Sequence, residues 1–256
     1  MDILRTNPDV NVNWRHGPHG HGALHRACEE GGLDLIVSSL LAHPDIDVNL
    51  KTDAGSSPFF VACSNGHTSC VRLLLRDSRV NLGDPDDNGD PPLIWAAYYG
   101  YLEICRWWIA SGREMDLGEP GDQGTDVIWV AKRPPGIGVN HQEKKAKLAI
   151  LLERFEENTD ETKHAVRVEL GWYDNVAAEV FALVVFVSDG LLQTKDTTTS
   201  PAARFFNIAR RLPLELQMAL CFRLVGSCKE IVLGNDSEVA FKSLARRLTY
   251  SSMFTN

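Results

Sequence analysis

The chain of 256 residues has no apolar run of membrane-spanning length. Its longest, VFALVVFV at 180–187, is far shorter than the roughly 20 residues that a transmembrane helix needs. The first ten residues, MDILRTNPDV, contain neither the apolar core of a signal peptide nor the Arg- and Ser-rich character of a transit peptide. The six cysteines form no pair of CxxC motifs, and their irregular spacing is typical of small buried residues in a reducing compartment. We therefore expect a soluble protein of the cytoplasm or nucleus without membrane contact.

The sequence also lacks the motifs of common enzymes. The GIG at 136–138 follows no strand-like run and precedes no Lys-Ser/Thr pair, so it is not a phosphate-binding loop. No Ser, Cys or Thr has a recognisable nucleophile context. The carboxylates of 84–90 lie in a turn-rich stretch open to water, where ordinary pKa values make them poor general acids. We expect no catalytic residue, no cofactor and no enzymatic activity.

Charge is unevenly distributed along the chain, whose formal net charge is −8. Residues 77–126 carry eleven acidic and three basic side chains, whereas residues 200–256 carry four acidic and eight basic ones. Nucleic-acid phosphates require a positive protein surface. The acidic middle of the chain therefore argues against nucleic acid as its main partner.

What the sequence does contain is a repeat. Segments 22–41, 57–75, 91–109 and 125–133 align on an apolar residue that recurs at spacings of 35, 34 and 34, at Leu24, Phe59, Leu93 and Val127. Three positions later each unit has a small residue, at Ala27, Ala62, Ala96 and Val130. A glycine able to end a helix follows in three units, at Gly31, Gly66 and Gly100. Each unit thus predicts a first helix that ends in a turn.

A second helix is predicted after each glycine, from apolar residues at helical spacing: Leu35, Ile36, Leu40 and Leu41 in one unit, Cys70, Val71, Leu74 and Leu75 in the next. The links at 43–58 and 77–92 are rich in Asp, Asn, Gly and Pro, which is turn chemistry. Ser57 followed by Pro58 predicts a helix N-cap and a first helical residue. The unit is therefore helix, turn, helix, with a long link between units.

Residues 49–67, NLKTDAGSSPFFVACSNGH, resemble the ankyrin repeat almost position by position, and the resemblance covers about residues 7–155. It implies an all-α solenoid of three to four helical pairs joined by hairpin loops. Three copies are clear. The fourth departs from the pattern because RPPGIGVNHQEKK at 133–145 lengthens its internal link, which leaves the register of its second helix open.

Four histidines and a cysteine lie within residues 16–28: His16, His19, His21, His25 and Cys28. A metal site would need imidazoles that converge within about 2.1 Å of one ion, and here they lie on a Gly/Pro-rich loop. The ankyrin resemblance instead implies that His25 forms hydrogen bonds across neighbouring turns, and that Cys28 and Cys63 share one buried position. We favour these structural roles and expect no metal.

In ankyrin arrays, variable positions of the first helices and the hairpin tips line a concave surface that binds partners. On this basis the resemblance implies a non-enzymatic protein-interaction module with an acidic and aromatic groove for a basic or amphipathic protein segment. Tyr98 and Tyr99 are expected to be exposed there, whereas Trp95 and Trp129 equally fit packing between adjacent repeats. The predicted partner-binding residues are Asp53, Ser64, Asn65, Asp86, Asp87, Asn88, Asp90, Trp95, Tyr98, Tyr99 and Trp129.

The repeat period disappears beyond about residue 156, which predicts two domains, 1–156 and 157–256. We expect a polar connection at 160–171 and then helices at 172–190, after Pro201, at 212–226 and at 237–248, which form a bundle that caps the last repeat of a monomer. An alternative rests on Leu212, Pro213, Glu215 and Leu216, which resemble the start of an F-box. That resemblance implies a substrate receptor of a cullin-type ubiquitin ligase, docked through residues 212–226.

Overall fold

The computed structural model describes residues 10–119, 126–134, 142–189, 201–209, 211–225, 240, 241 and 244. The chain divides into two units, Met1–Val166 and Arg167–Asn256. Within the described residues the regular structure is helical, apart from one isolated antiparallel bridge between His16 and His21. The predicted all-α class is confirmed.

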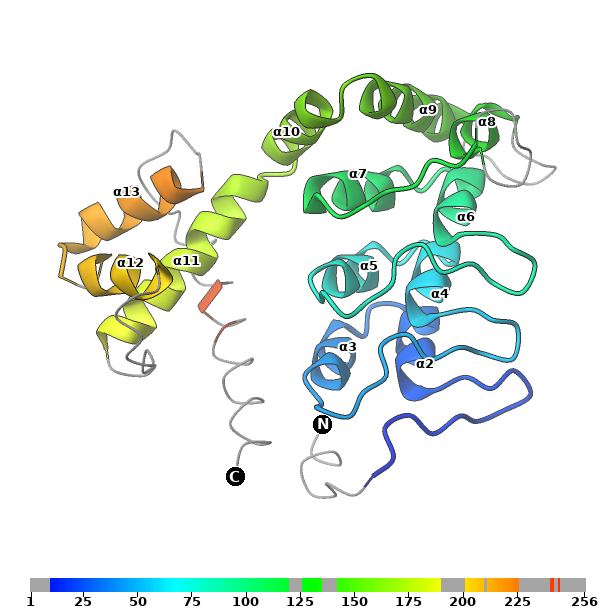
Figure 1. Ribbon diagram of the computed structural model, residues 1–256, viewed down its shortest axis with the longest axis horizontal. Helices are drawn as coiled ribbons and strands as arrows, with labels where there is room; N and C mark the ends of the chain where they lie inside the picture. Colours follow the sequence, from blue (N-terminus) through cyan, green and yellow to red (C-terminus); the bar gives the residue numbers. More distant parts are fainter. Residues whose placement is uncertain are drawn as a thin grey trace. The chain divides into compact units, whose positions relative to one another are not determined.

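Helices of the first unit alternate between two layers (Figure 1). The first helix of each pair lies in one layer, formed by α2 (Ala23–Glu30), α4 (Pro58–Ser64), α6 (Pro92–Tyr99) and α8 (Val127–Lys132). The second helices form the other layer, α3 (Asp34–Leu41), α5 (Thr68–Leu75), α7 (Leu102–Ser111) and α9 (Gln142–Glu157). Links between pairs extend beyond the first-helix layer (Figure 1).

Local signals set the helix ends as predicted. The Ser57 hydroxyl accepts a hydrogen bond from the Phe60 backbone N–H (3.1 Å), and Pro58 is the first residue of α4. The Asp126 carboxylate caps α8 in the same way, by accepting from the Trp129 N–H at 2.8 Å. Gly100 ends α6 in the left-handed conformation with φ +71°.

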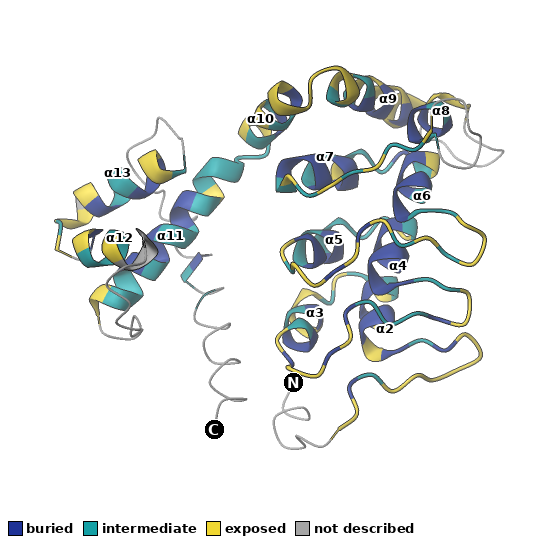
Figure 2. Cartoon of the chain, viewed as in Figure 1, coloured by how far each residue is buried: buried dark blue, intermediate teal, exposed yellow. Residues whose placement is uncertain are grey.

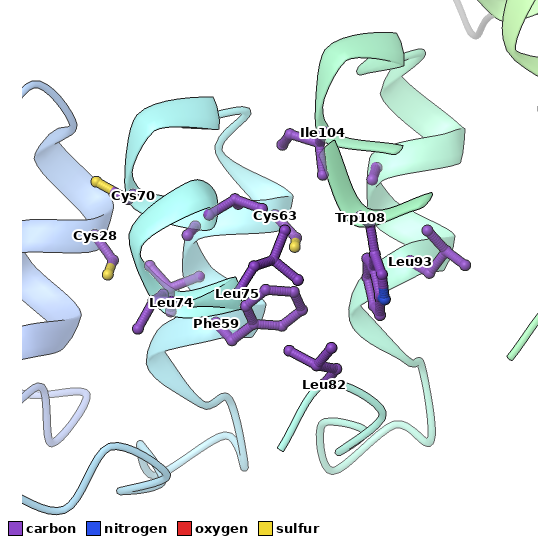
Figure 3. Close-up of a cluster of buried hydrophobic side chains, with 14 of the residues drawn as sticks. Cys28, Phe59, Cys63, Cys70, Leu74, Leu75, Leu82, Leu93, Ile104 and Trp108 are labelled. Atoms are coloured by element: carbon purple, nitrogen blue, oxygen red, sulfur yellow. The ribbon is translucent and has the colours of Figure 1, made fainter. Parts of the chain in front are cut away.

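The core of the first unit runs continuously between helical pairs, and the burial pattern follows the two layers (Figure 2). The ring of Phe59 meets the indole of Trp108 edge-on, with centroids 5.0 Å apart (Figure 3). Cys28 and Cys63 are completely buried, which confirms their predicted place in the core. Burial raises the pKa of the Cys63 thiol well above its usual value, so this cysteine is chemically quiet.

Helix α3 turns Val37 and Leu40 toward the core, where both are buried. These two residues are three apart and share one face of the helix. Leu35 and Ile36, two of the apolar residues from which the helix was predicted, are 46% and 42% exposed. Four apolar residues within one helix did not by themselves show which of them face the core.

The segment 160–171, predicted to be a polar connection, is mostly helix α10 (Thr159–Glu169), so this prediction was wrong. The Asn158 side chain caps the helix by accepting from the Glu161 N–H (3.2 Å) and donating to the Glu161 carboxylate (2.8 Å). Only Thr162 and Val166 of α10 are buried. A helix with so small an apolar face has little periodic signal, and its polar composition resembled a loop.

In the second unit, α11 (Trp172–Ser188), α12 (Pro201–Ala209) and α13 (Leu214–Leu224) share a buried cluster that includes Phe181, Cys221 and Phe222. Predicted features at Gly190, Ser200, Gly226 and most of 237–248 lie outside the described residues. The packing of these helices on the last repeat stays a prediction.

Among the described helices, none alone has the length and apolar composition to cross a membrane. Helices α10 and α11 taken together pass that test, with a bend of 68° between them.

Candidate partner-binding surface

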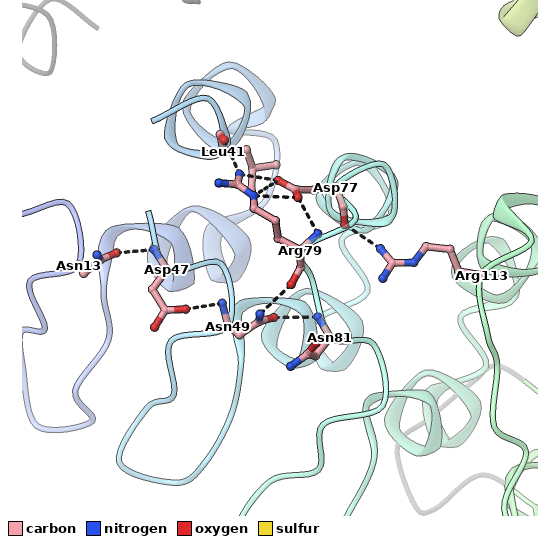
Figure 4. A network of polar contacts seen from close by, with 8 residues as sticks. All are labelled: Asn13, Leu41, Asp47, Asn49, Asp77, Arg79, Asn81 and Arg113. Atoms are coloured by element: carbon pink, nitrogen blue, oxygen red, sulfur yellow. Dashed lines mark hydrogen bonds and ion pairs between the residues drawn. The ribbon is translucent and has the colours of Figure 1, made fainter. Parts of the chain in front are cut away.

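Asparagine side chains hold each link between repeats to the next one (Figure 4). Asn13 donates to the Asp45 carbonyl (2.7 Å) and accepts from the Asp47 N–H (2.8 Å). One repeat later, Asn49 donates to the Arg79 carbonyl and accepts from the Asn81 N–H, both at 2.8 Å. Since these bonds satisfy backbone groups of the neighbouring loop, they fix the loops in register.

Two arginines brace the same loops (Figure 4). Arg79 donates to the Leu41 carbonyl at 2.7 Å and pairs with the Asp77 carboxylate, whose pKa it lowers. Arg113, one repeat further on, donates to the Asp77 carbonyl (2.7 Å) and the Val80 carbonyl (2.6 Å). The loops that carry the predicted acidic residues are therefore anchored at their bases.

The loop tips also bond to one another along the repeat direction. The Asp53 N–H donates to the His19 carbonyl at 3.0 Å, and the Asp87 N–H donates to the Ala54 carbonyl at 3.1 Å. The Asp87 carboxylate lies where a Cβ on Gly55 would be, and Gly55 has φ +72°, so only glycine fits this close approach without strain. Neighbouring loop tips are thus joined to one another by backbone hydrogen bonds along the stack.

The predicted acidic residues differ in their availability. The Asp53 carboxylate is ion-paired with Arg15. Asp86 accepts from the N–H groups of Asn88 and Asp90, both at 3.0 Å, and so shapes its own turn. Burial and the Asp86 charge raise the pKa of Asp90, contrary to the ordinary value expected for the carboxylates of 84–90. Residues Asp86, Asp87, Asn88 and Asp90 share one tip, and Asp53 lies on the neighbouring one.

Four aromatic rings of α6 and the start of α7 form a contiguous cluster. Tyr98 is 41% exposed, as predicted, and meets Tyr99 edge-on with centroids 5.1 Å apart. Tyr99 was also expected to be exposed but is half-buried, because its ring stacks between Trp95 (6.1 Å) and Tyr101 (5.5 Å). The cluster therefore consists of an exposed tyrosine on a supporting stack.

The two tryptophans are half-buried, so each has both a packing and a surface side. The indole N–H of Trp95 is buried and has no hydrogen-bond partner among the described residues. An unpaired buried donor lowers the free energy of unfolding by about 1–3 kcal/mol, so this cluster is locally destabilising. The indole of Trp129 is covered by the Arg133 guanidinium, 4.4 Å from the ring centre.

Ser64 and Asn65 occupy the positions of α4 that Tyr98 and Tyr99 occupy one repeat later. The Ser64 hydroxyl and the Asn65 amide both donate to the Val61 carbonyl, at 3.1 and 2.9 Å. They are half-buried and exposed, respectively. Their side chains are thus partly engaged by their own helix.

Sequence reasoning missed a basic element of this surface. Helix α9 places Lys145 so that its Nζ lies 5.4 Å from the centre of the Tyr98 ring, and the lysine is only 2% exposed. Burial and then the nearby charge of Arg133 lower the Lys145 pKa. The position of Lys145 could not be predicted from the repeat, because the lengthened link before α9 breaks the spacing of about 34 residues.

The histidine-rich stretch has the structural role expected of it. The Gly22 N–H donates to His25 Nδ1 (3.1 Å), which leaves Nε2 to donate to the Ser56 carbonyl of the next repeat (3.2 Å). Burial is the main cause that lowers the His25 pKa to about 4. No group of three His, Cys, Asp or Glu in the described part of the chain is arranged to hold a metal ion.

These features define a protein of stacked helical pairs with two neighbouring exposed regions, the first helices and the loop tips. The family model of ankyrin repeats, in three copies, matches residues 7–118. The chain is an ankyrin-repeat protein over these residues, and its function class is that of a protein–protein interaction module. The pair α8 and α9 continues the stack beyond the matched residues.

Several curated proteins are similar to parts of the chain. The SMC5-SMC6 complex localization factor protein 1 of Bos taurus is 37% identical over 106 residues, which are 41% of this chain and 10% of that protein. Its Homo sapiens counterpart is 31% identical over 158 residues, 59% of this chain and 14% of that protein. The putative ankyrin repeat protein YahD of Escherichia coli is 36% identical over 115 residues, 43% of this chain and 55% of that protein. The chain thus spans about a tenth of the length of the first of these relatives.

Proposed function

We propose that the protein binds a segment of another protein at the first-helix surface centred on Tyr98, as a scaffold without chemistry of its own. The observation that supports the proposal is the aromatic cluster of Trp95, Tyr98 and Tyr99. Its two tyrosines occupy positions where the two preceding repeats have polar side chains, Ser64 and Asn65 in one and Glu29 and Glu30 in the other. The Tyr98 ring is exposed and does not belong to the continuous hydrophobic core, so core packing does not account for it.

Energetics favour this region as a binding site. Tyrosine and tryptophan are over-represented among the few residues that dominate interface affinity, because they bury a large area and keep a polar group for hydrogen bonding. The stack beneath Tyr98 fixes its surroundings before binding, which lowers the entropic cost of association. The unpaired Trp95 N–H adds a donor that a rearrangement on binding would satisfy.

Charge favours a basic or amphipathic partner segment at the acidic end of the surface. The tip at residues 86–90 and Glu30 on α2 supply negative charge, whereas the Glu29 carboxylate is ion-paired with Arg26. Electrostatic steering of a basic segment speeds association at low salt and is screened above about 0.1 M ionic strength. We therefore expect the association rate with such a partner to fall steeply with salt.

The relatives give limited further support. SMC5-SMC6 complex localization factor protein 1 is named for the localization of a protein complex, which agrees with binding to another protein. We propose by this analogy that the partner belongs to a protein assembly, in the nucleus or the cytoplasm.

Affinity capture with the full chain tests the proposal. Tyr98→Ala should reduce recovery of a specific partner by tenfold or more, because truncation of a central aromatic residue commonly costs 2 kcal/mol or more. The matched control is Leu35→Ala, which removes an equally exposed apolar side chain from the second-helix layer. Equal recovery with the wild type and Tyr98→Ala, in a variant with unchanged melting temperature, would refute the proposal.

A second function is favoured by the surface of α13. Leu214 and Leu216 are each 53% exposed in the first turn of the helix, and Pro213 directly precedes it. The Leu212 carbonyl accepts from the Gln217 amide at 2.9 Å, whereas the Glu215 side chain lies outside the described residues. We propose this segment as the alternative docking element for the adaptor of a cullin-type ubiquitin ligase.

The two roles are separable by experiment. Leu216→Asp should abolish co-purification of the cullin adaptor, because it places a charge in the proposed interface. Ile208→Asp introduces the same charge at a similarly exposed residue of α12, outside residues 212–226, and should leave the adaptor bound. If neither the wild type nor Ile208→Asp recovers an adaptor, the ubiquitin-ligase role is excluded and the Tyr98 surface is unaffected.

A further inference from the structure

A pocket of about 460 Å³ lies between α8 and α9, next to the aromatic cluster. Its wall includes Lys132, Arg133, Lys145 and Glu153, with Gln142 at the first turn of α9. Three basic residues and one acidic residue therefore contribute to the pocket wall, in a chain whose formal net charge is −8. So positive a lining is unusual in this protein and predicts an anionic ligand.

One of the cations is already neutralised. Lys132 Nζ lies 2.6 Å from the Glu153 carboxylate, in an ion pair at the edge of the pocket. Arg133 and Lys145 have no ion pair with any carboxylate of the described residues. The pocket thus holds an excess of two positive charges.

The Arg133 side chain is preorganised to bind an anion. Its guanidinium stacks on the indole of Trp129, 4.4 Å from the ring centre. Stacking uses the flat face of the guanidinium and leaves its N–H groups, which lie in the plane, to form two parallel hydrogen bonds with an oxyanion. The stacked geometry also lowers the entropy lost on binding.

Lys145 gives an independent observation. The residue is only 2% exposed, its side chain packs over Gly100, and its ammonium lies 5.4 Å from the centre of the Tyr98 ring without an ion pair to any carboxylate of the described residues. A buried cation is costly without a partner of opposite charge, and a cation–π contact offsets only part of that cost. A bound anion would compensate both Lys145 and the repulsion from Arg133 that contributes to its lowered pKa.

We propose that this pocket binds a phosphorylated side chain of the protein segment that lies on the Tyr98 surface, with Arg133 and Lys145 as the principal contacts. The inference rests on the proposed function, since the segment reaches the pocket by passing Tyr98. A phosphomonoester carries about −1.5 to −2 charges near pH 7, which matches the two uncompensated cations, whereas a carboxylate carries one. Its three oxygens also suit a guanidinium fork and an ammonium together.

The test compares two libraries of degenerate peptides, centred on phosphoserine and on serine, for binding to the full chain. We expect the phosphoserine peptides to bind at least tenfold more tightly. Arg133→Gln should abolish this preference while leaving the binding of serine peptides unchanged. The matched control is Lys147→Gln, which removes a cation of α9 that pairs with Glu143 outside the pocket, and it should keep the preference.

A second measurement separates this inference from the proposed function. Inorganic phosphate and O-phosphoserine are titrated into the labelled wild type and Arg133→Gln, and NMR shifts are followed near Arg133 and Lys145. Saturable shifts in the wild type alone, without peptide binding, would support the anion site and refute the Tyr98 surface. Peptide binding without a phosphoserine preference would overturn the anion site alone, as would the absence of Arg133-dependent shifts with both phosphate probes.

Discussion

The ring of Tyr101 lies directly over Gly66 of the preceding repeat, so that a Cβ on Gly66 would come within 2.7 Å of the ring. The same relationship recurs along the stack: the His67 ring lies over Gly31, and Lys145 lies over Gly100. His67 also donates to the Glu29 carbonyl at 2.8 Å. In these three repeats the glycine at the end of the first helix is therefore also the point at which the next repeat packs.

This relationship predicts an unequal response to two similar substitutions. Gly66→Ala combines the strain of φ +77° with a clash against Tyr101, and should lower the free energy of unfolding by about 2–5 kcal/mol. Gly32→Ala shares a positive φ of +66° but has no atom within 4 Å of the new Cβ, so it should cost about 1–2 kcal/mol. Urea denaturation measures both, and equal losses would contradict the docking role of Gly66.

The buried His25 predicts a loss of stability in mild acid. Its pKa falls from 6.5 in the unfolded chain to about 4 in the folded one, so below pH 6.5 the unfolded state takes up a proton that the folded state does not. The free energy of unfolding should therefore decline as pH falls from 6.5 to about 4, by about 3 kcal/mol from this group.

His25→Gln isolates that contribution from the carboxylates that titrate in the same range. The variant loses hydrogen bonds to Gly22 and Ser56, and should be less stable than the wild type near pH 7 by about 1–2 kcal/mol. Because glutamine does not titrate, the gap between the two proteins should close as pH falls and then reverse in sign near pH 4. A constant gap would show that His25 does not titrate on unfolding.

The loop register should depend on Asn49. Asn49→Ala leaves the Arg79 carbonyl and the Asn81 N–H without their side-chain partners, and should lower the free energy of unfolding by about 1–2 kcal/mol. Asn88→Ala is the control, because its amide bonds only to Asp86 within its own exposed tip. Its expected effect lies within about 0.5 kcal/mol. Comparable losses for both would mean that the loops are not held by these cross-repeat bonds.

Lys145 is expected to cost stability. Lys145→Met removes a buried cation and should raise the free energy of unfolding at pH 7 by on the order of 1 kcal/mol. Since burial lowers the Lys145 pKa in the folded state, the wild type should regain this difference as pH rises toward 10.5. Lys147→Met, on the exposed side of α9, should change stability by less than about 0.5 kcal/mol. A strongly destabilised Lys145→Met would indicate that the lysine holds the stack together instead.

Much of the first unit follows from local sequence. A helix–turn–helix unit needs only a small residue where helices approach, a glycine where the first helix ends, and turn residues in the link, and these recur at a nearly constant spacing. That spacing predicted the helical pairs, the cap at Ser57 and the burial of Cys28 and Cys63, all of which the structure confirms. The ankyrin resemblance placed His25 between turns, where it does bond to Gly22 and Ser56.

The sequence by itself thus determined the repeat, because helix ends and core positions depend on neighbours within a few residues. Only the tertiary structure decided that Leu35 faces outward, that Tyr99 is half-buried and that α10 is a helix, since each depends on what packs against it. The contact between Lys145 and Tyr98 could not be predicted from the sequence either. A link of irregular length separates the two residues, and contacts across such a link depend on how whole repeats stack.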